Sequence, residues 1–231
     1  MLKRYVNRDW LEREPDLAAR EATALRIMAN SAVAVPEVIA VDPDGSACGA
    51  PSLLMTRLVG SHRWVPPSIE QFAEVAIAVH DVVPPPHMRR YRRYVPPGAE
   101  PPPWTTQRRL WERALVVADA ADPAASSTGF IHRDHHAGNV LWWRGRVSGV
   151  VDMVEACVGP LAVDAARARL NLAWEIDLDA ARRYARCPDV AVDPVWDVVD
   201  AIDCCIGIGG KGETIRKAHD AFLAEALSQL G

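Results

Sequence analysis

Three polar side chains that carry oxygen atoms stand close together in the middle of the sequence: Asp134, Asn139 and Asp152. Two short apolar runs, 140–143 and 147–151, separate the second from the third, and the charged, glycine-containing segment between the runs is typical of a turn. A hairpin symmetric about that turn would place Asn139 opposite Asp152, with Asp134 in a loop at the same end. Carboxylate and amide oxygens grouped in this way suit a hard divalent cation beside a catalytic carboxylate.

The same segment resembles the catalytic and metal-binding loops of the protein-kinase-like fold. It has the form His132-x-Asp134-x4-Asn139, followed after the predicted hairpin by Asp152. Its residues, His-Arg-Asp-His-His-Ala-Gly-Asn-Val-Leu-Trp and then Gly-Val-Val-Asp, are most similar to the aminoglycoside phosphotransferase family of small-molecule kinases. The resemblance implies that Asp134 is the catalytic base and that His132 positions the loop backbone. It also implies that Asn139 and Asp152 bind Mg²⁺.

A lysine and a glutamate near the start of the sequence fit this resemblance. We predict one short strand within residues 1–6, followed by a helix from Pro15 whose apolar positions recur at helical spacing and share their face with Glu21. A buried carboxylate needs a partner, and Lys3 on the preceding strand is the candidate. The alternatives are that the helix rotates to expose Glu21, or that Arg4 replaces Lys3. In the kinase-like fold such a pair holds the nucleotide phosphates.

Two further strands are predicted, at 35–41 and 52–58. By resemblance, the second strand leads to a hinge where backbone groups from Met55 to Arg57 contact the purine, whereas its residues alone indicate only a core strand. The kinase-like fold also places two strands and a glycine-rich, phosphate-covering loop before the lysine. The sequence as given contains no such loop before Lys3. We therefore expect either a reduced sheet lobe or a sequence that begins late.

Helical spacing of apolar residues predicts a mainly helical second part. Ser68 resembles the first residue of a capping box, His80 is expected to be a packed or capping histidine, and Asp164, by resemblance, braces the catalytic loop. The predicted helices are 68–80, 107–118, 161–174, 178–185, 194–206 and 213–230.

Three segments allow a functional and a structural interpretation. Asp197, Asp200 and Asp203 share one arc of a predicted helix and could receive a cationic substrate, but the solvated face of an amphipathic helix is favoured. Segment 89–94 alternates cations and aromatic residues, as nucleic-acid patches do, but a solvated surface loop is favoured. Segment 207–212 lacks the strand and the hydroxyl residue of a phosphate loop and is predicted to connect two helices.

Composition limits the possible partners and compartments. The 231 residues are 49% hydrophobic and 24% charged, which is ordinary for a globular protein, and the net charge of −4 gives no reason to expect nucleic acid or an anionic membrane as a partner. The five scattered cysteines form no Cys-x-x-Cys pair and are expected to be free thiols. Without an apparent signal peptide or long apolar run, we expect a cytoplasmic protein with no membrane partner.

These observations predict an α+β, protein-kinase-like, two-lobe fold. A truncated sheet lobe would occupy residues 1–58, and a helical lobe carrying the catalytic and metal-binding hairpin would occupy residues 59–231. The predicted function is a small-molecule O-phosphotransferase that moves the γ-phosphoryl group of ATP or GTP to a substrate hydroxyl with Mg²⁺. Its partner would be a small hydroxylated molecule, with cationic compounds among the candidates. The sequence leaves the acceptor, the choice between ATP and GTP, and the oligomeric state open.

Two alternative functions remain open at this point. One is a degenerate kinase-like binding protein that has lost its nucleotide clamp. The other is a metal-dependent hydrolase that uses the cluster of His132, Asp134, His135 and His136. The hydrolase is less favoured, because binuclear hydrolases of that kind need a histidine at the place of Asp134.

Overall fold

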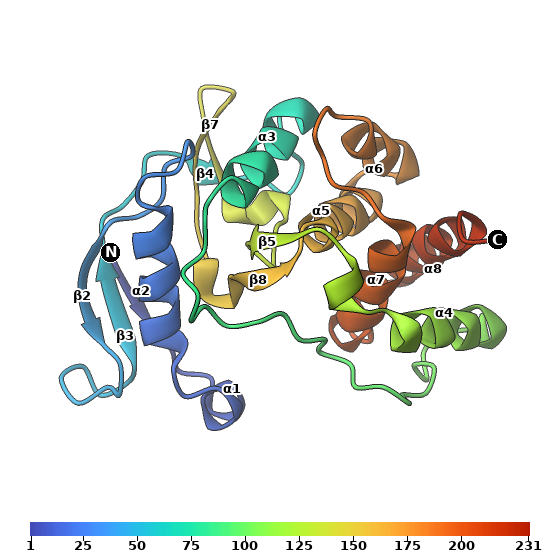
Figure 1. The fold of residues 1–231 in the computed structure, drawn as a ribbon, viewed down its shortest axis with the longest axis horizontal. Helices are drawn as coiled ribbons and strands as arrows, with labels where there is room; N and C mark the ends of the chain where they lie inside the picture. The colour runs from blue at the N-terminus through green and yellow to red at the C-terminus, as the bar shows by residue number, and fades with distance from the viewer.

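The computed structural model describes residues 1–231, and a three-stranded antiparallel sheet lies at its amino-terminal end (Figure 1). The sheet has the order β1 (Leu2–Arg4), β3 (Ser52–Met55), β2 (Val38–Asp42). Helix α2 (Leu17–Met28) packs beside it, in blue in Figure 1. Lys3 lies opposite Leu53 in the register, so the strand predicted within residues 1–6 carries the lysine as the middle residue of an edge strand.

A short helix that the sequence analysis did not predict, α1 (Arg8–Arg13), lies between β1 and α2. The side chain of Asn7 caps it by accepting a hydrogen bond from the backbone N–H of Trp10, at 3.1 Å. The predicted helix start at Pro15 is wrong by two residues, because Pro15 stands in the turn that connects α1 to α2. Glu21 is 1% exposed on the buried face of α2, as predicted.

A second sheet contains the predicted hairpin and has the order β4 (Ser61–His62), β6 (Val140–Trp143), β7 (Arg146–Val150). The predicted register is wrong: the backbone N–H of Val151 donates to the carbonyl of Asn139, at 2.9 Å, so Asp152 lies one residue beyond the pair. Two features set the observed register. The two-residue turn at Arg144 and Gly145, both with positive φ, pairs Trp143 with Arg146, two residues earlier than predicted, and a register shift between Leu141 and Trp142 moves the pairing back by one.

The predicted catalytic loop, residues 132–139, follows a two-stranded sheet of β5 (Thr128–Ile131) and β8 (Cys157–Pro160). β5 runs into the loop that carries Asp134, and β8 runs into the helix that carries Asp164. Three short 3-10 turns complete this region: η1 (Pro123–Ala125), η2 (Ala137–Asn139) and η3 (Met153–Glu155). The sheet therefore places the start of the catalytic loop beside the start of its bracing helix.

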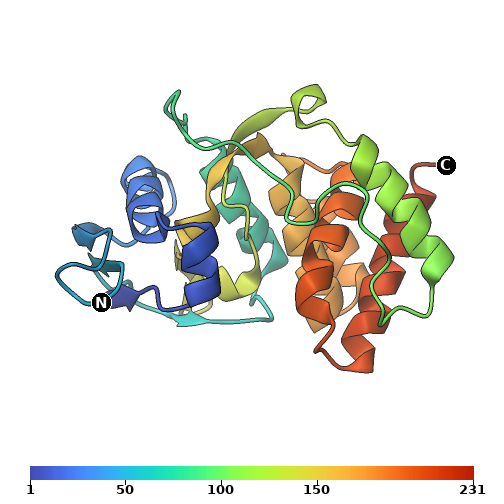
Figure 2. The ribbon, with the colours of Figure 1, turned by 90° about the horizontal axis from the view of Figure 1, so that it is seen from below.

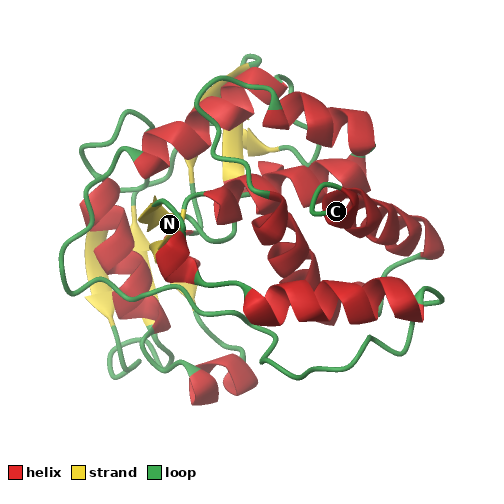
Figure 3. Ribbon diagram, turned by 45° about the vertical axis from the view of Figure 1, so that its right-hand side comes forward, coloured by secondary structure: helices red, strands yellow, loops and turns green.

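Six longer helices form the rest of the fold, and all six match predicted ones. They gather on the side away from the first sheet, as the red ribbons of Figure 3 show. The last long helix before the terminal one runs to Ile208, so Gly207 is helical and the connecting loop is shorter than predicted. The helices are α3 (Ile69–His80), α4 (Arg108–Ala120), α5 (Ala162–Glu175), α6 (Leu178–Ala185), α7 (Pro194–Ile208) and α8 (Glu213–Ser228).

An irregular segment, 81–107, connects α3 to α4 along the outside of the helices (Figure 2). It is anchored to β8, because the backbone N–H of Tyr91 donates to Val158, at 2.8 Å, and that of Val158 donates to Arg89, at 2.9 Å. Tyr91 is only 8% exposed, so the prediction of a solvated loop at 89–94 is wrong for this residue. None of the helices is long and apolar enough to cross a membrane.

Candidate active site

Asp164, near the start of α5, holds the backbone of the catalytic loop. Its carboxylate accepts hydrogen bonds from the backbone N–H groups of His132 and Arg133, both at 2.8 Å, and lies 3.1 Å from Nε2 of His80. Burial would raise the pKa of Asp164, but the His80 hydrogen bond and the neighbouring histidines lower it to about 2. Arg133 has a positive φ of 71°, a strained conformation for a residue with a side chain. Asp164 therefore stabilises a loop conformation that the chain alone would not favour.

Asp134 follows directly and turns its carboxylate toward a pocket. Oδ2 lies 3.4 Å from Nε2 of His136 and accepts a hydrogen bond from Nδ2 of Asn139, at 3.3 Å, while Oδ1 lies 3.8 Å from Nε of Arg167. Burial would raise the pKa of Asp134, but the His136 hydrogen bond and the charge of Arg167 hold it well below its usual range. Asp134 is thus an ionised hydrogen-bond acceptor at neutral pH.

The predicted lysine–glutamate pair is present. Nζ of Lys3 lies 2.6 Å from Oε2 of Glu21 and 2.6 Å from Oδ1 of Asp152, and the hydroxyl of Tyr5 also bonds to Glu21. Burial would lower the pKa of Lys3, but the two carboxylates raise it. Arg4, the alternative to Lys3, points away and donates to the carbonyl of Cys48, at 3.0 Å. The fold thereby joins the start of the chain to the end of the hairpin.

The donor set fits the expected magnesium ion. The amide of Asn139 uses its Nδ2 to bond Asp134, so that its carbonyl oxygen is the group left to bind a cation, and Asp152 supplies a half-exposed carboxylate. His132 links the loop of Asp134 and Asn139 to the segment of Asp152, because its Nε2 lies 3.0 Å from the carbonyl oxygen of Val151. Few protein ligands completed by phosphate and water oxygens are what Mg²⁺ prefers.

The histidine cluster does not have the geometry of a metal centre. His135 is fully buried and stacks on Phe72, with ring centroids 4.6 Å apart, and burial lowers its pKa to about 3. His136 stacks instead on Trp64, at 5.1 Å, and its Nδ1 accepts from the backbone N–H of Gly138. No three His, Cys, Asp or Glu side chains come together as metal ligands. The structure therefore gives no support to the hydrolase alternative.

Several backbone groups of the predicted hinge, from Met55 to Arg57, are already hydrogen-bonded within the first sheet. Both backbone groups of Met55 are hydrogen-bonded to Met1, at 2.9 Å and 2.6 Å, and the backbone N–H of Thr56 donates to Glu37. Arg57 is exposed. Contact of a purine with Met55 or Arg57 stays a prediction, and of the two only Arg57 has its backbone groups outside the hydrogen bonds of the first sheet.

The three aspartates of α7 are not a solvated face, and that prediction is wrong. They are at most 3% exposed and pair with arginines from other elements. Asp197 pairs with Arg169 of α5, while Asp200 and Asp203 lie 3.4 Å and 2.6 Å from the guanidinium of Arg133. Their charges are already neutralised inside the fold, which leaves them unavailable to a cationic substrate.

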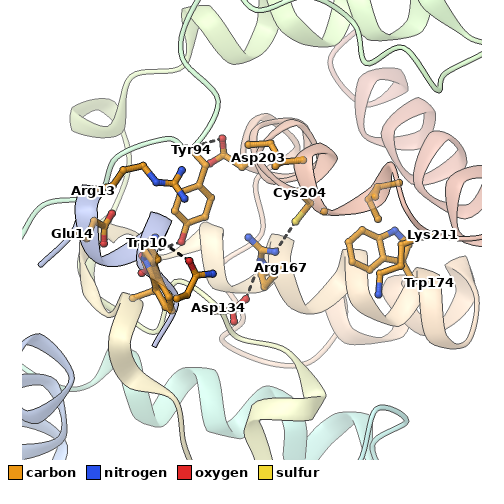
Figure 4. Close-up of a pocket in the computed structure, with 15 residues that line it drawn as sticks. Trp10, Arg13, Glu14, Tyr94, Asp134, Arg167, Trp174, Asp203, Cys204 and Lys211 are labelled. Carbon is orange, nitrogen blue, oxygen red and sulfur yellow. Dashed lines mark hydrogen bonds and ion pairs between the residues drawn. The ribbon is translucent and has the colours of Figure 1, made fainter. Parts of the chain in front are cut away.

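A pocket of about 570 Å³ opens beside Asp134 (Figure 4). Its wall includes three residues that the sequence analysis did not single out, Trp10 of α1 and Arg167 and Trp174 of α5. It also includes Tyr94 of segment 89–94, which the sequence analysis expected in a solvated loop. The asparagine cap before Trp10 was the available signal for α1. The others carry no local signal, because only the packing of α5, α7 and the 81–107 segment brings them together.

The two-part arrangement and the lysine–glutamate–aspartate contact define a protein with the kinase-like fold. The chain belongs to the phosphotransferase enzyme family, whose sequence model matches residues 2–202. This confirms the resemblance drawn from the segment around Asp134. No curated protein matches the chain.

Solved structures of aminoglycoside phosphotransferases share the fold. That of APH(4)-Ia is 18% identical, covers 94% of this chain and 84% of its own, and has a TM-score of 0.61. A thermostable mutant of the same enzyme, in a ternary complex with AMP-PNP and hygromycin B, is 17% identical with a TM-score of 0.65, covering 93% of this chain and 84% of its own. APH(3'')-Id from Streptomyces rimosus, in complex with ADP and streptomycin, is 16% identical, covers 96% and 85%, and has a TM-score of 0.60.

Proposed function

We propose that this chain is a cytoplasmic small-molecule O-phosphotransferase that moves the γ-phosphoryl group of ATP or GTP to a substrate hydroxyl. One observation carries the proposal: Lys3 and Glu21 meet Asp152, while Asp134 faces a pocket large enough for a small molecule. The adenine-nucleotide complexes of the similar structures support a nucleotide as co-substrate. Membership of a phosphotransferase family supports the class of reaction.

Each residue of the site would have a separate role in phosphoryl transfer. Phosphoryl transfer has a loose transition state, so that positioning and charge neutralisation contribute most of the catalysis. Asp134, with its lowered pKa, would orient the acceptor hydroxyl and take its proton late in the reaction. Lys3 would bind phosphate oxygens, held in place by Glu21. Asn139 and Asp152 would hold Mg²⁺, which would supply positive charge against the phosphates.

The first test is Asp134→Ala. The side chain of Asp134 is 36% exposed and contributes little to the core, so we expect the variant to fold and bind nucleotide but to lose phosphoryl transfer. A loss of at least about a hundredfold in turnover is expected for removal of a general base. The assay is nucleotide consumption with a panel of hydroxylated compounds, with circular dichroism as the folding control. Retained turnover would contradict the assigned role.

Asp152→Ala tests the metal site separately. We expect the variant to lose Mg²⁺-dependent nucleotide binding, measured by isothermal titration with and without Mg²⁺. Asp179→Ala, which removes an exposed carboxylate on α6, is the control and should bind as the unmodified protein does. Unchanged binding in Asp152→Ala would favour a degenerate, non-catalytic member of the family.

A further inference from the structure

The carboxylates that line the pocket beside Asp134 all have cationic partners. Glu14 lies 2.5 Å from Arg20, and Glu155 lies 3.0 Å from the same guanidinium. Asp203 lies 2.6 Å from Arg133. The fourth carboxylate, Asp134 itself, has Arg167 and His136 as neighbours. A cationic ligand would have to take a carboxylate away from a partner that is already in place.

Two cations of the same pocket have no such partner. The guanidinium of Arg13, at the end of α1, donates only to the backbone carbonyl of Asp9, at 2.9 Å, and has no carboxylate within ion-pair distance. Lys211, in the loop after α7, forms no side-chain hydrogen bond or ion pair in the structure, and it is exposed. Figure 4 shows Arg13 at one side of the pocket and Lys211 at the other, with Asp134 and Arg167 between them. The two charged side chains of the pocket that have no ion-pair partner are therefore both positive.

Aromatic rings supply much of the remaining wall. Trp10 and Tyr94 lie on the side of Arg13, and Trp174 lies on the side of Lys211 (Figure 4). Trp10 and Trp174 are partly exposed, and Tyr94 is 40% exposed. Ring faces of this kind favour flat or apolar molecules through area burial and stacking. They also give a ligand a surface to contact between the two free cations.

We infer that the pocket selects a hydroxylated acceptor with an apolar ring and an anionic group, and that it disfavours polycations. The inference rests on the proposed function and names its substrate class. A polycation would meet the unpaired charges of Arg13 and Lys211 without an unpaired carboxylate to balance them, since Arg167 is itself paired with Asp200, at 3.2 Å. An anionic group can instead bind Arg13 or Lys211 at no cost to an existing ion pair, while the ring packs on the tryptophan of the same side, Trp10 or Trp174, and the hydroxyl reaches Asp134.

The test uses the full chain and three probes that carry the same hydroxymethyl-substituted benzene ring and differ in the group para to it, which is anionic, neutral or cationic. They are 4-(hydroxymethyl)benzoate, 4-(hydroxymethyl)benzamide and 4-(aminomethyl)benzyl alcohol, with hygromycin B as a polycation; binding is measured by isothermal titration without nucleotide. We expect the anionic probe to bind about tenfold more tightly than the cationic one, because Arg13 and Lys211 are both exposed and each contributes only modestly. Tighter binding of the cationic probe or of hygromycin B would overturn the inference.

Matched variants assign the effect to the two cations. Arg13→Gln combined with Lys211→Gln is expected to remove the preference for the anionic probe. Arg109→Gln, which neutralises an exposed arginine on α4 outside the pocket, is expected to keep it. An unchanged preference in the double variant would also overturn the inference. Binding of ATP and of GTP with Mg²⁺, measured in parallel, separates the two proposals: if neither nucleotide binds, the phosphotransferase proposal fails, whatever the order of the probes.

Discussion

Asp164 shows how far a single residue can determine the geometry of the site. It accepts two backbone hydrogen bonds from the catalytic loop and is fully buried. Its place after the hairpin was recognisable from the sequence through family resemblance, as were Lys3, Glu21 and Asp134. Glu21 could also be placed from the helical spacing of its apolar neighbours, whereas the bracing role of Asp164 was predicted from the resemblance alone.

We predict that Asp164→Ala lowers both stability and turnover. Two buried N–H groups would lose their acceptor, at about 1–3 kcal/mol each, and His80 would lose its partner. The free energy of unfolding, from urea titration, should therefore fall by about 3 kcal/mol or more. The unfolding free energy of Asp164→Asn, which keeps one acceptor oxygen, should lie between those of Asp164→Ala and the unmodified protein. Equal stability of Asp164→Ala and the unmodified protein would contradict the bracing role.

At the scale of elements, helices were predictable where their periodicity was long and local. All six helices after residue 59 were found this way, whereas α1 was missed because six residues show too little periodicity. The register of the hairpin was missed because it depends on the φ values of its turn and on a register shift between Leu141 and Trp142, neither of which the apolar pattern encodes. The burial of the α7 aspartates was missed for another reason: their partners are distant in the sequence. Arg133, which pairs with Asp200 and Asp203, is 67 and 70 residues away, and the second partner of Asp200 is Arg167 of α5.

The contact between α7 and the catalytic loop allows a sharp test. The guanidinium of Arg133 lies between the rings of Tyr91 and Tyr94, 4.5 Å and 4.2 Å from their centroids, and bonds Asp203 at 2.6 Å. We predict that Asp203→Ala costs about 3–5 kcal/mol of unfolding free energy, because it leaves a buried guanidinium without its closest partner.

A double-mutant cycle between Arg133→Gln and Asp203→Ala should give a coupling of about 1–3 kcal/mol. The matched control is the exposed pair of Arg182 and Glu225, also 2.6 Å apart, whose coupling should stay below about 1 kcal/mol. Equal couplings for the two pairs would show that burial adds nothing to the contact between α7 and the catalytic loop.

For the whole molecule, buried histidines couple stability to pH. His219 is fully buried and stacks between Trp111 and Trp174, at 5.3 Å and 5.7 Å, and burial lowers its pKa to about 3. The unfolded chain, with a histidine pKa of about 6.5, binds more protons than the folded one between these values. His219 therefore destabilises the fold as the pH falls from about 6.5 toward 3. Asp197 acts in the opposite direction, because burial raises its pKa to about 6.

We predict that His219→Phe, which keeps an aromatic ring between the tryptophans, weakens acid destabilisation. The difference in unfolding free energy between the variant and the unmodified protein should shift in favour of the variant by at most about 1.4 kcal/mol per pH unit below 6.5. The measurement is urea unfolding at pH 7, 6, 5 and 4. A difference that does not change with pH would show that His219 does not stay neutral in the fold.

The contact between Lys3 and Asp152 has a consequence for how strongly metal and nucleotide bind together. The ammonium group acts as an internal counterion on the carboxylate that would bind the metal. A divalent cation arriving alone must displace it, whereas a cation arriving with a triphosphate offers the lysine new oxygens in exchange. Metal and nucleotide would thus strengthen each other's binding, as thermodynamic linkage requires to the same degree in both directions. This cooperativity would be built into a single 2.6 Å contact that joins the first strand to the end of the hairpin.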